Sequence, residues 1–128
     1  MGIFHTNITI RHVADRKRIA HVSSVLVDTG SESTWVSRKV LEGLGIEVEV
    51  KDRTYQMANG QQITRSVGYV VIESGADFRT VDEVVFAEEG DLQLLGARTL
   101  EGFNARVDLT NKRLVAAGPM PAAAGKSY

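Results

Sequence analysis

The segment Asp28-Thr29-Gly30-Ser31 contains the side chains of this sequence that are best suited to chemistry. It follows the run Ser24 to Val27, whose β-branched and apolar residues are typical of a buried strand. A carboxylate at the end of such a strand is costly to bury unless hydrogen bonds meet it, and Thr and Ser hydroxyls can supply them. Gly30 allows a tight bend and the close approach of a second backbone. The segment can therefore hold an ionised acid in a fixed pose, although Asp and Gly are also ordinary turn residues.

Length and composition narrow the classes of function. The chain has 128 residues, 43% of them hydrophobic, a net charge of −1 and no cysteine. These values fit one globular domain and exclude disulfides and thiol catalysis. The balanced charge gives no reason to expect a nucleic-acid partner, and no apolar stretch is long enough for a transmembrane helix. The start of the chain lacks the pattern of a secretory signal, so we expect a cytoplasmic protein with no membrane partner.

Apolar and polar residues alternate along most of the chain, which predicts an all-β protein with one or two short helices. Expected strands are 6–13, 19–27, 46–50, 53–58, 61–66, 67–74, 79–87, 92–95, 105–109 and 113–117. Helices are expected over 36–44, with Ser37 as N-cap and Gly45 as its stop, and over 97–103. Short strands at regular intervals favour a closed or sandwich-like sheet. We expect one domain over 1–117 and a flexible tail over 118–128.

Three features follow one another in a fixed order. The Asp-Thr-Gly-Ser segment is followed by three residues and Trp35-Val36; a hairpin over 55–63 then carries Asn59-Gly60 at its tip. Leu94-Leu95-Gly96 precedes the second helix and a terminal hairpin. Together these features resemble the retropepsin-like aspartic proteases, the single-domain relatives of pepsin. The resemblance implies a closed, β-barrel-like acid-protease fold with one pepsin-like lobe per subunit.

The chemistry of that family is peptide hydrolysis with water as the nucleophile and no metal or other cofactor. One carboxylate takes a proton from water, and one carboxylic acid donates a proton to the substrate carbonyl. Two neighbouring aspartates cannot both ionise, so they share one proton. Because this chain has a single Asp-Thr-Gly, we predict a homodimer with Asp28 of each subunit on the twofold axis. The substrate is expected to be an extended peptide or protein.

The resemblance also implies a role for each neighbour of Asp28. Thr29 would bond across the dimer axis, and Gly30 would present its N–H to the carboxylate. Ser31 would donate to the outer carboxylate oxygen, which predicts a lower pH optimum than in a Ser31→Ala variant. Leu95 and Gly96 would pack beside the catalytic loop. The hairpin over 55–63 would be a flap that closes over the substrate; its expected contact residues are Tyr55, Met57, Ala58, Asn59 and Gly60.

Other interpretations stay open at this point. The same fold could be a catalytically silent dimerisation or peptide-binding module, in which a sheet edge binds a partner strand. An actin-like or sugar-kinase ATPase also places Asp-x-Gly-Ser/Thr after a strand, but this chain lacks the length and helices of those enzymes. Trp35 is expected to be a packing residue, whereas Tyr55 could equally contact substrate or pack in a strand.

The remaining polar residues have ordinary explanations. His5, His12 and His21 lack the spacing of metal ligands and are expected on the surface. The pairs Asp82-Glu83 and Glu88-Glu89 are most simply solvated loop charges. Arg98 is expected to be a helix-surface residue rather than a partner for an acid at the dimer contact.

Overall fold

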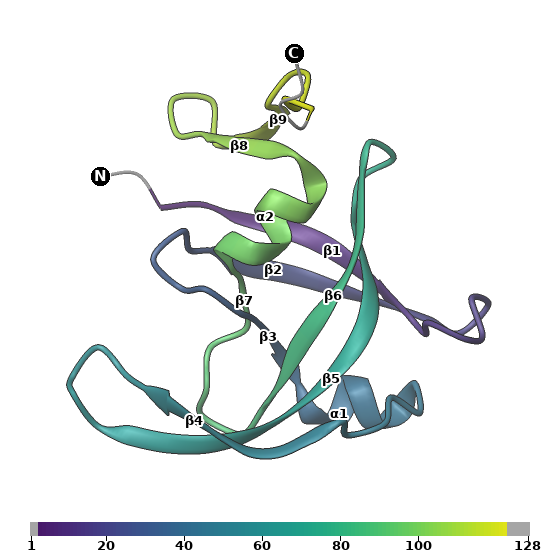
Figure 1. The fold of residues 1–128 in the computed structure, drawn as a ribbon, viewed down its shortest axis with the longest axis vertical. Coiled ribbons are helices and arrows are strands. Elements are labelled where there is room, and N and C mark those ends of the chain that lie inside the picture. The colour runs from purple at the N-terminus through teal and green to yellow at the C-terminus, as the bar shows by residue number, and fades with distance from the viewer. Residues whose placement is uncertain (1–2, 123–128) are drawn as a thin grey trace, which may run out of the picture.

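The computed structural model describes residues 3–122, and within them the chain is predominantly β-structure with two short helices (Figure 1). The prediction of an all-β protein is thereby confirmed. The helices are α1 (Arg38–Gly43) and α2 (Ala97–Phe103). The strands, in chain order, are β1 (His5–Arg11), β2 (Ile19–Val27), β3 (Thr34–Ser37), β4 (Val50–Gln56), β5 (Gln62–Ser74), β6 (Phe78–Ala87), β7 (Leu94–Leu95), β8 (Ala105–Asp108) and β9 (Arg113–Ala116).

The strand pairings form a ring. The main sheet has the order β1-β2-β7-β3-β6-β5-β4, and β1 pairs with β5 as well as with β2. Strand β4 therefore lies outside the ring, where it forms a hairpin with β5. This hairpin extends to one side of the molecule, away from the separate β8–β9 hairpin at the C-terminal end (Figure 1). The segments 61–66 and 67–74, expected as two strands, are the single long strand β5.

Two apolar clusters lie within this arrangement. The larger cluster is built from alternate residues of β1, β5 and β6, as the twofold period of a strand requires, together with Val22 and Val25 of β2, and both helices cover it. The smaller cluster lies between β3, β5, β6 and β7, and the hairpin residues Tyr55 and Ile63 pack against it. Its buried members are Trp35, Val67, Val85, Ala87 and Leu94. The smaller cluster therefore forms the base on which the β4–β5 hairpin rests.

The first helix is shorter than expected because β3 precedes it. Val36, expected at the start of the helix, instead pairs in parallel with Phe86 of β6, and Trp35 before it pairs with Val85. Ser37 is the N-cap as predicted, since its side chain accepts a hydrogen bond from the Lys39 N–H.

The segment after α1 is not the strand expected over 46–50. The N–H of Gly45 donates to the Glu42 carbonyl, and the N–H of Ile46 donates to that of Leu41. With Gly45 at φ +76°, this is a Schellman ending of the helix. The motif commits the Ile46 amide to the helix end, and strand β4 begins at Val50.

The second helix matches the prediction over 97–103, and the terminal hairpin follows it as expected. Strand β7 is shorter than predicted and includes only Leu94 and Leu95. Residues 118–122 are exposed and belong to no helix or strand; the rest of the tail expected over 118–128 lies outside the described residues. Neither helix of the described part of the chain is long and apolar enough to cross a membrane.

Candidate active site

Asp28 lies directly after β2, where that strand runs parallel to β7. Its N–H donates to the Leu95 carbonyl oxygen at 3.0 Å, which ties it to the neighbouring strand. Its side-chain Oδ1 accepts the Gly30 N–H at 2.9 Å, the contact expected from the sequence. The Ser31 N–H donates to the Asp28 carbonyl at 3.2 Å and closes the turn. One oxygen of the half-buried carboxylate is therefore held by its own loop.

The other three residues of the motif have different environments. Thr29 and Gly30 are exposed, and Ser31 is half-buried. The Ser31 hydroxyl donates to the Ser33 carbonyl at 3.0 Å. A serine has one hydroxyl hydrogen, so the expected bond from Ser31 to the Asp28 carboxylate is not formed in this structure. The loop stabilises its own backbone with this hydroxyl instead.

Strand β7 and the start of α2 lie behind residues 28–33, which we call the Asp28 loop. The Ala97 N–H donates to the Ser31 carbonyl at 2.7 Å, and the Arg98 N–H donates to the Glu32 carbonyl at 3.0 Å. Leu95 and Gly96 are both buried here. A Cβ on Gly96 would collide with the carbonyl oxygens of Ser33 and Glu32. The absence of a side chain at Gly96 is therefore what lets the helix and the loop come this close.

A cleft of about 610 Å³ opens in front of the Asp28 loop. One side is formed by the loop, a second by the hairpin, and a third by the segment before β7. The lining residues are Asp28, Gly30, Ser31, Glu32, Ser33, Trp35, Tyr55, Gln56, Met57, Ala58, Gly90, Asp91, Leu92 and Leu94. The structure thus brings a carboxylate and three of the predicted flap residues to one cavity.

The hairpin tip, residues 57–61, is a turn stabilised by its own residues. The Met57 N–H donates to the Gln61 carbonyl and the Gly60 N–H to the Met57 carbonyl, both at 2.8 Å. Gly60 has φ +86°, the geometry of a three-residue hairpin loop with glycine in the left-handed region. Met57 and Ala58 line the cleft, whereas Asn59 and Gly60 form the turn and do not line it.

Tyr55 packs in the sheet and also lines the cleft. Its ring lies 5.2 Å from the ring of Trp35, between centroids, at an interplanar angle of 59°. Trp35 is buried as expected and also lines the cleft. The Tyr55 hydroxyl is buried and has no hydrogen-bond partner among the described residues.

These features can be compared with known protein families. Residues 20–102 match the family model described as "gag-polyprotein putative aspartyl protease". The chain belongs to this family. The matched segment contains the Asp28 loop, the hairpin and Leu95-Gly96, so the resemblance to retropepsin-like aspartic proteases is confirmed. A search of curated proteins finds no match.

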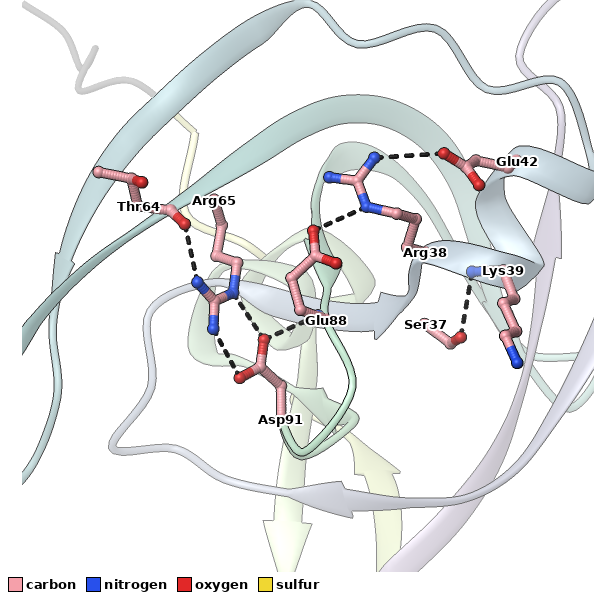
Figure 2. Close-up of polar contacts among 8 residues, drawn as sticks. All are labelled: Ser37, Arg38, Lys39, Glu42, Thr64, Arg65, Glu88 and Asp91. Atoms are coloured by element: carbon pink, nitrogen blue, oxygen red, sulfur yellow. Dashed lines mark hydrogen bonds and ion pairs between the residues drawn. The ribbon is translucent and has the colours of Figure 1, made fainter.

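In this member of the aspartyl protease family, an ion pair fixes the cleft wall formed by residues 88–93, which we call the wall loop. Arg65 of β5 binds both carboxylate oxygens of Asp91, with Nε–Oδ2 and NH2–Oδ1 distances of 2.7 and 2.9 Å (Figure 2). Oδ2 also accepts the Glu88 N–H at 2.8 Å. Chiefly through its hydrogen bonds to Arg65, the Asp91 carboxyl has a pKa below its ordinary value.

A second arginine holds the other end of the wall loop. Arg38 of α1 donates from Nε to Glu88 at 2.7 Å and from NH1 to Glu42 at 3.3 Å (Figure 2). Glu88 is therefore ion-paired rather than simply solvated, whereas Glu89 is exposed as expected. The wall loop is anchored to both the hairpin and α1.

The pair Asp82-Glu83 was expected to be a solvated loop charge, and this prediction is wrong. Both residues lie on β6 with only 9% and 7% of their surface exposed. Glu83 pairs with Arg53 of β4 at 2.8 Å. Arg98 is exposed on α2 as expected, and its guanidinium also lies 3.5 Å from Asp82 and 3.7 Å from Glu83. The one available sequence signal was that this polar pair interrupts the apolar residues between Val81 and Ala87.

No metal centre is found in the part of the chain that the structure describes, since no three His, Asp or Glu side chains gather there. His5 and His21 are exposed. The Nδ1 atom of His12 accepts the Ala14 and Asp15 N–H groups in the β1–β2 turn. All three histidines therefore lie away from the cleft lining.

Proposed function

We propose that this protein is an aspartic endopeptidase that acts as a homodimer on extended peptides. The observation that carries the proposal is Asp28, which lies at the floor of a cleft that a β-hairpin borders. The aspartyl protease family match supports the reaction class. In this proposal the ring of strands corresponds to one lobe of the acid-protease barrel, and the hairpin acts as the flap.

The cleft contains two further acids, and their environments favour a second carboxylate from another subunit. Asp91 is held by both nitrogens of the Arg65 fork, so it is not free to handle protons during catalysis. Glu32 is exposed on the loop. The exposed Thr29 and Gly30 form the part of the loop that a second copy could approach. A symmetric dimer would place two copies of Asp28 face to face.

In the proposed mechanism, the two Asp28 carboxyls hold one proton between them. The ionised carboxyl removes a proton from water as the water oxygen bonds to the scissile carbonyl carbon, while the protonated carboxyl donates to the carbonyl oxygen. The resulting diol collapses as the C–N bond breaks. The amine takes the proton that came from water, and a diol hydroxyl returns its proton to the other carboxyl. The pair ends with one shared proton, ready for the next cycle.

Peptide-library cleavage by three matched proteins tests the catalytic assignment. Asp28→Asn removes the proposed acid–base group without a change in size and should abolish cleavage across acidic to neutral pH. Glu32→Gln removes the exposed cleft carboxyl and should retain a measurable kcat. Loss of all turnover in Glu32→Gln would place the second acid within one chain and would contradict the shared site.

Subunit mixing tests the dimer directly. With equal amounts of parent and Asp28→Asn protein, random exchange converts half of the parent chains into mixed dimers, so activity should fall to about half. Unchanged activity would mean that each chain works alone. Light scattering supplies the mass in solution as an independent measure. If the parent binds peptides but cleaves none at any pH, the catalytically silent module becomes the better description.

A further inference from the structure

We propose that Asp82 is a positioning residue for the Asp28 loop, which it holds through a directional chain of hydrogen bonds. The chain runs from the Gly96 N–H through the hydroxyls of Thr34 and Thr99 to the Asp82 carboxylate. This role rests on the proposed function, because it assumes that the loop performs the reaction. Asp82 does not line the cleft, so its effect is exerted through other residues.

The members of the chain are buried and within hydrogen-bond distance. Thr34 and Thr99 are 0% exposed, and Asp82 is 9% exposed. The Gly96 nitrogen lies 3.0 Å from Thr34 Oγ1, the two hydroxyl oxygens are 2.6 Å apart, and Thr99 Oγ1 lies 3.0 Å from Asp82 Oδ2. Buried polar groups that lost these partners would carry the full cost of desolvation.

The direction of each hydrogen bond follows from the groups at its two ends. An amide N–H can only donate, so Thr34 Oγ1 is the acceptor for Gly96. The only hydroxyl hydrogen of Thr99 is donated to Asp82 Oδ2. Thr99 must therefore accept from Thr34, and the Thr34–Thr99 bond is directed toward the acid. The carboxylate thus orients both hydroxyls so that an acceptor faces the Gly96 amide.

Both ends of this hydrogen-bond chain connect to other parts of the fold. At the acid end, Asp82 Oδ1 accepts the Glu83 N–H at 2.8 Å, and Arg98 lies 3.5 Å away. At the loop end, Gly96 lies between Leu95, whose carbonyl accepts the Asp28 N–H, and Ala97, whose N–H binds the Ser31 carbonyl. The chain therefore acts on the peptide units that contact the Asp28 loop from behind. A small displacement of these units would move the reacting carboxyl, to which rates are sensitive.

The decisive variants are at Thr99, where shape and hydroxyl can be separated. Thr99→Val keeps the shape but removes the hydroxyl, and kcat should fall by about tenfold while KM changes by less than about twofold. Thr99→Ser keeps the hydroxyl and should restore most of kcat. Thr80→Val is the control, because it removes a hydroxyl from the same strand as Asp82 but outside the hydrogen-bond chain. An equal loss of kcat in Thr99→Ser and Thr99→Val would overturn the proposal, as would an unchanged kcat in a folded Thr99→Val protein.

Amide hydrogen exchange tests the same chain of hydrogen bonds without a measurement of catalysis. Exchange of the Gly96 and Ala97 amides should accelerate in Thr99→Val and return to the parent rate in Thr99→Ser. If Thr99→Val does not fold, Asp82→Asn supplies the second variant, since its amide replaces one acceptor with a donor and should give the same local acceleration. A parent protein that cleaves nothing would refute the proposed function only, because the exchange data would still decide whether the chain holds the loop. Uniform acceleration over all amides would contradict a specific positioning role.

Discussion

The Asp28 loop and the hairpin tip border the same cleft but are held in different ways. The loop receives hydrogen bonds from the backbone of α2 and donates one to β7, and the buried chain to Asp82 supports it from behind. The hairpin tip consists of exposed residues whose backbone bonds are made within its own turn. Chemistry requires an acid fixed to within a fraction of an ångström, whereas a cover over a substrate must open. The cleft therefore has one wall that the rest of the fold holds and one wall whose tip is held mainly by its own turn.

The largest expected effect is at the contact between loop and helix. Gly96→Ala places a methyl group against the carbonyl oxygens of Ser33 and Glu32, and backbone must move to accommodate it. We expect the free energy of unfolding to fall by about 3 kcal/mol in urea denaturation. Gly43→Ala is the matched control, because a Cβ there meets nothing within 4 Å. An equal loss at the two positions would show that the loop is not tightly packed.

The next effect concerns the ion pair that connects the hairpin to the wall loop. The Arg65 and Asp91 side chains are 18% and 13% exposed, so this ion pair is intermediate between an exposed pair and a fully buried one. Asp91→Asn should therefore lower the free energy of unfolding by about 1–2 kcal/mol. Glu42→Gln breaks the exposed Arg38 pair in the same region and should cost less than about 0.5 kcal/mol. A smaller loss in Asp91→Asn than in Glu42→Gln would refute this ranking.

The same pair predicts a dependence of stability on pH. The folded-state pKa of Asp91 is below its ordinary value because Arg65 binds the ionised form. Its contribution is fully present above the pKa of the unfolded chain and is lost as the pH falls through the lower folded-state pKa. The stability difference between parent and Asp91→Asn should thus be constant near neutral pH and shrink in acid. A difference that grows as the pH falls would contradict the assignment.

A change at the hairpin tip should have a smaller and more local effect. Gly60 has a positive φ, so Gly60→Ala should cost about 1 kcal/mol in strain within the turn. Gly60→Asn should cost less, because asparagine tolerates this conformation. Faster amide exchange confined to the Met57 and Gln61 region is the expected readout. Exchange that also accelerates at the Asp28 loop would show that the two regions are coupled after all.

The smallest effect is expected for Ser31→Ala. The structure uses the Ser31 hydroxyl on the Ser33 carbonyl and not on the Asp28 carboxylate. This replaces the sequence-based prediction of a lower pH optimum. We now expect the pH–rate profiles of the parent and Ser31→Ala to have the same optimum. A clear shift in the optimum would indicate that the hydroxyl turns toward Asp28 in the active protein.

Local patterns predicted much of the fold. The range of α2, the N-cap at Ser37 and the terminal hairpin follow from signals between residues close in sequence. The prediction of a strand over 46–50 was wrong, because the alternating residues that suggested a strand there follow directly on the end of α1. Val36 fits a helical pattern equally well, and only its pairing with β6 assigns it to a strand. Apolar runs that are short cannot be assigned from periodicity alone.

By itself, the sequence determined the class of the protein, which the family match confirms, the acid at the end of an apolar strand, and the order of loop, hairpin and glycine. Only the tertiary structure decided which polar residues support that acid. Asp82 and Thr99 are far from Asp28 along the chain, yet folding brings them behind its loop. Asp91 likewise meets Arg65 only because β5 passes the wall loop. Such pairs carry no local signal, since hydrogen bonds and ion pairs depend on distance in space and not on spacing in sequence.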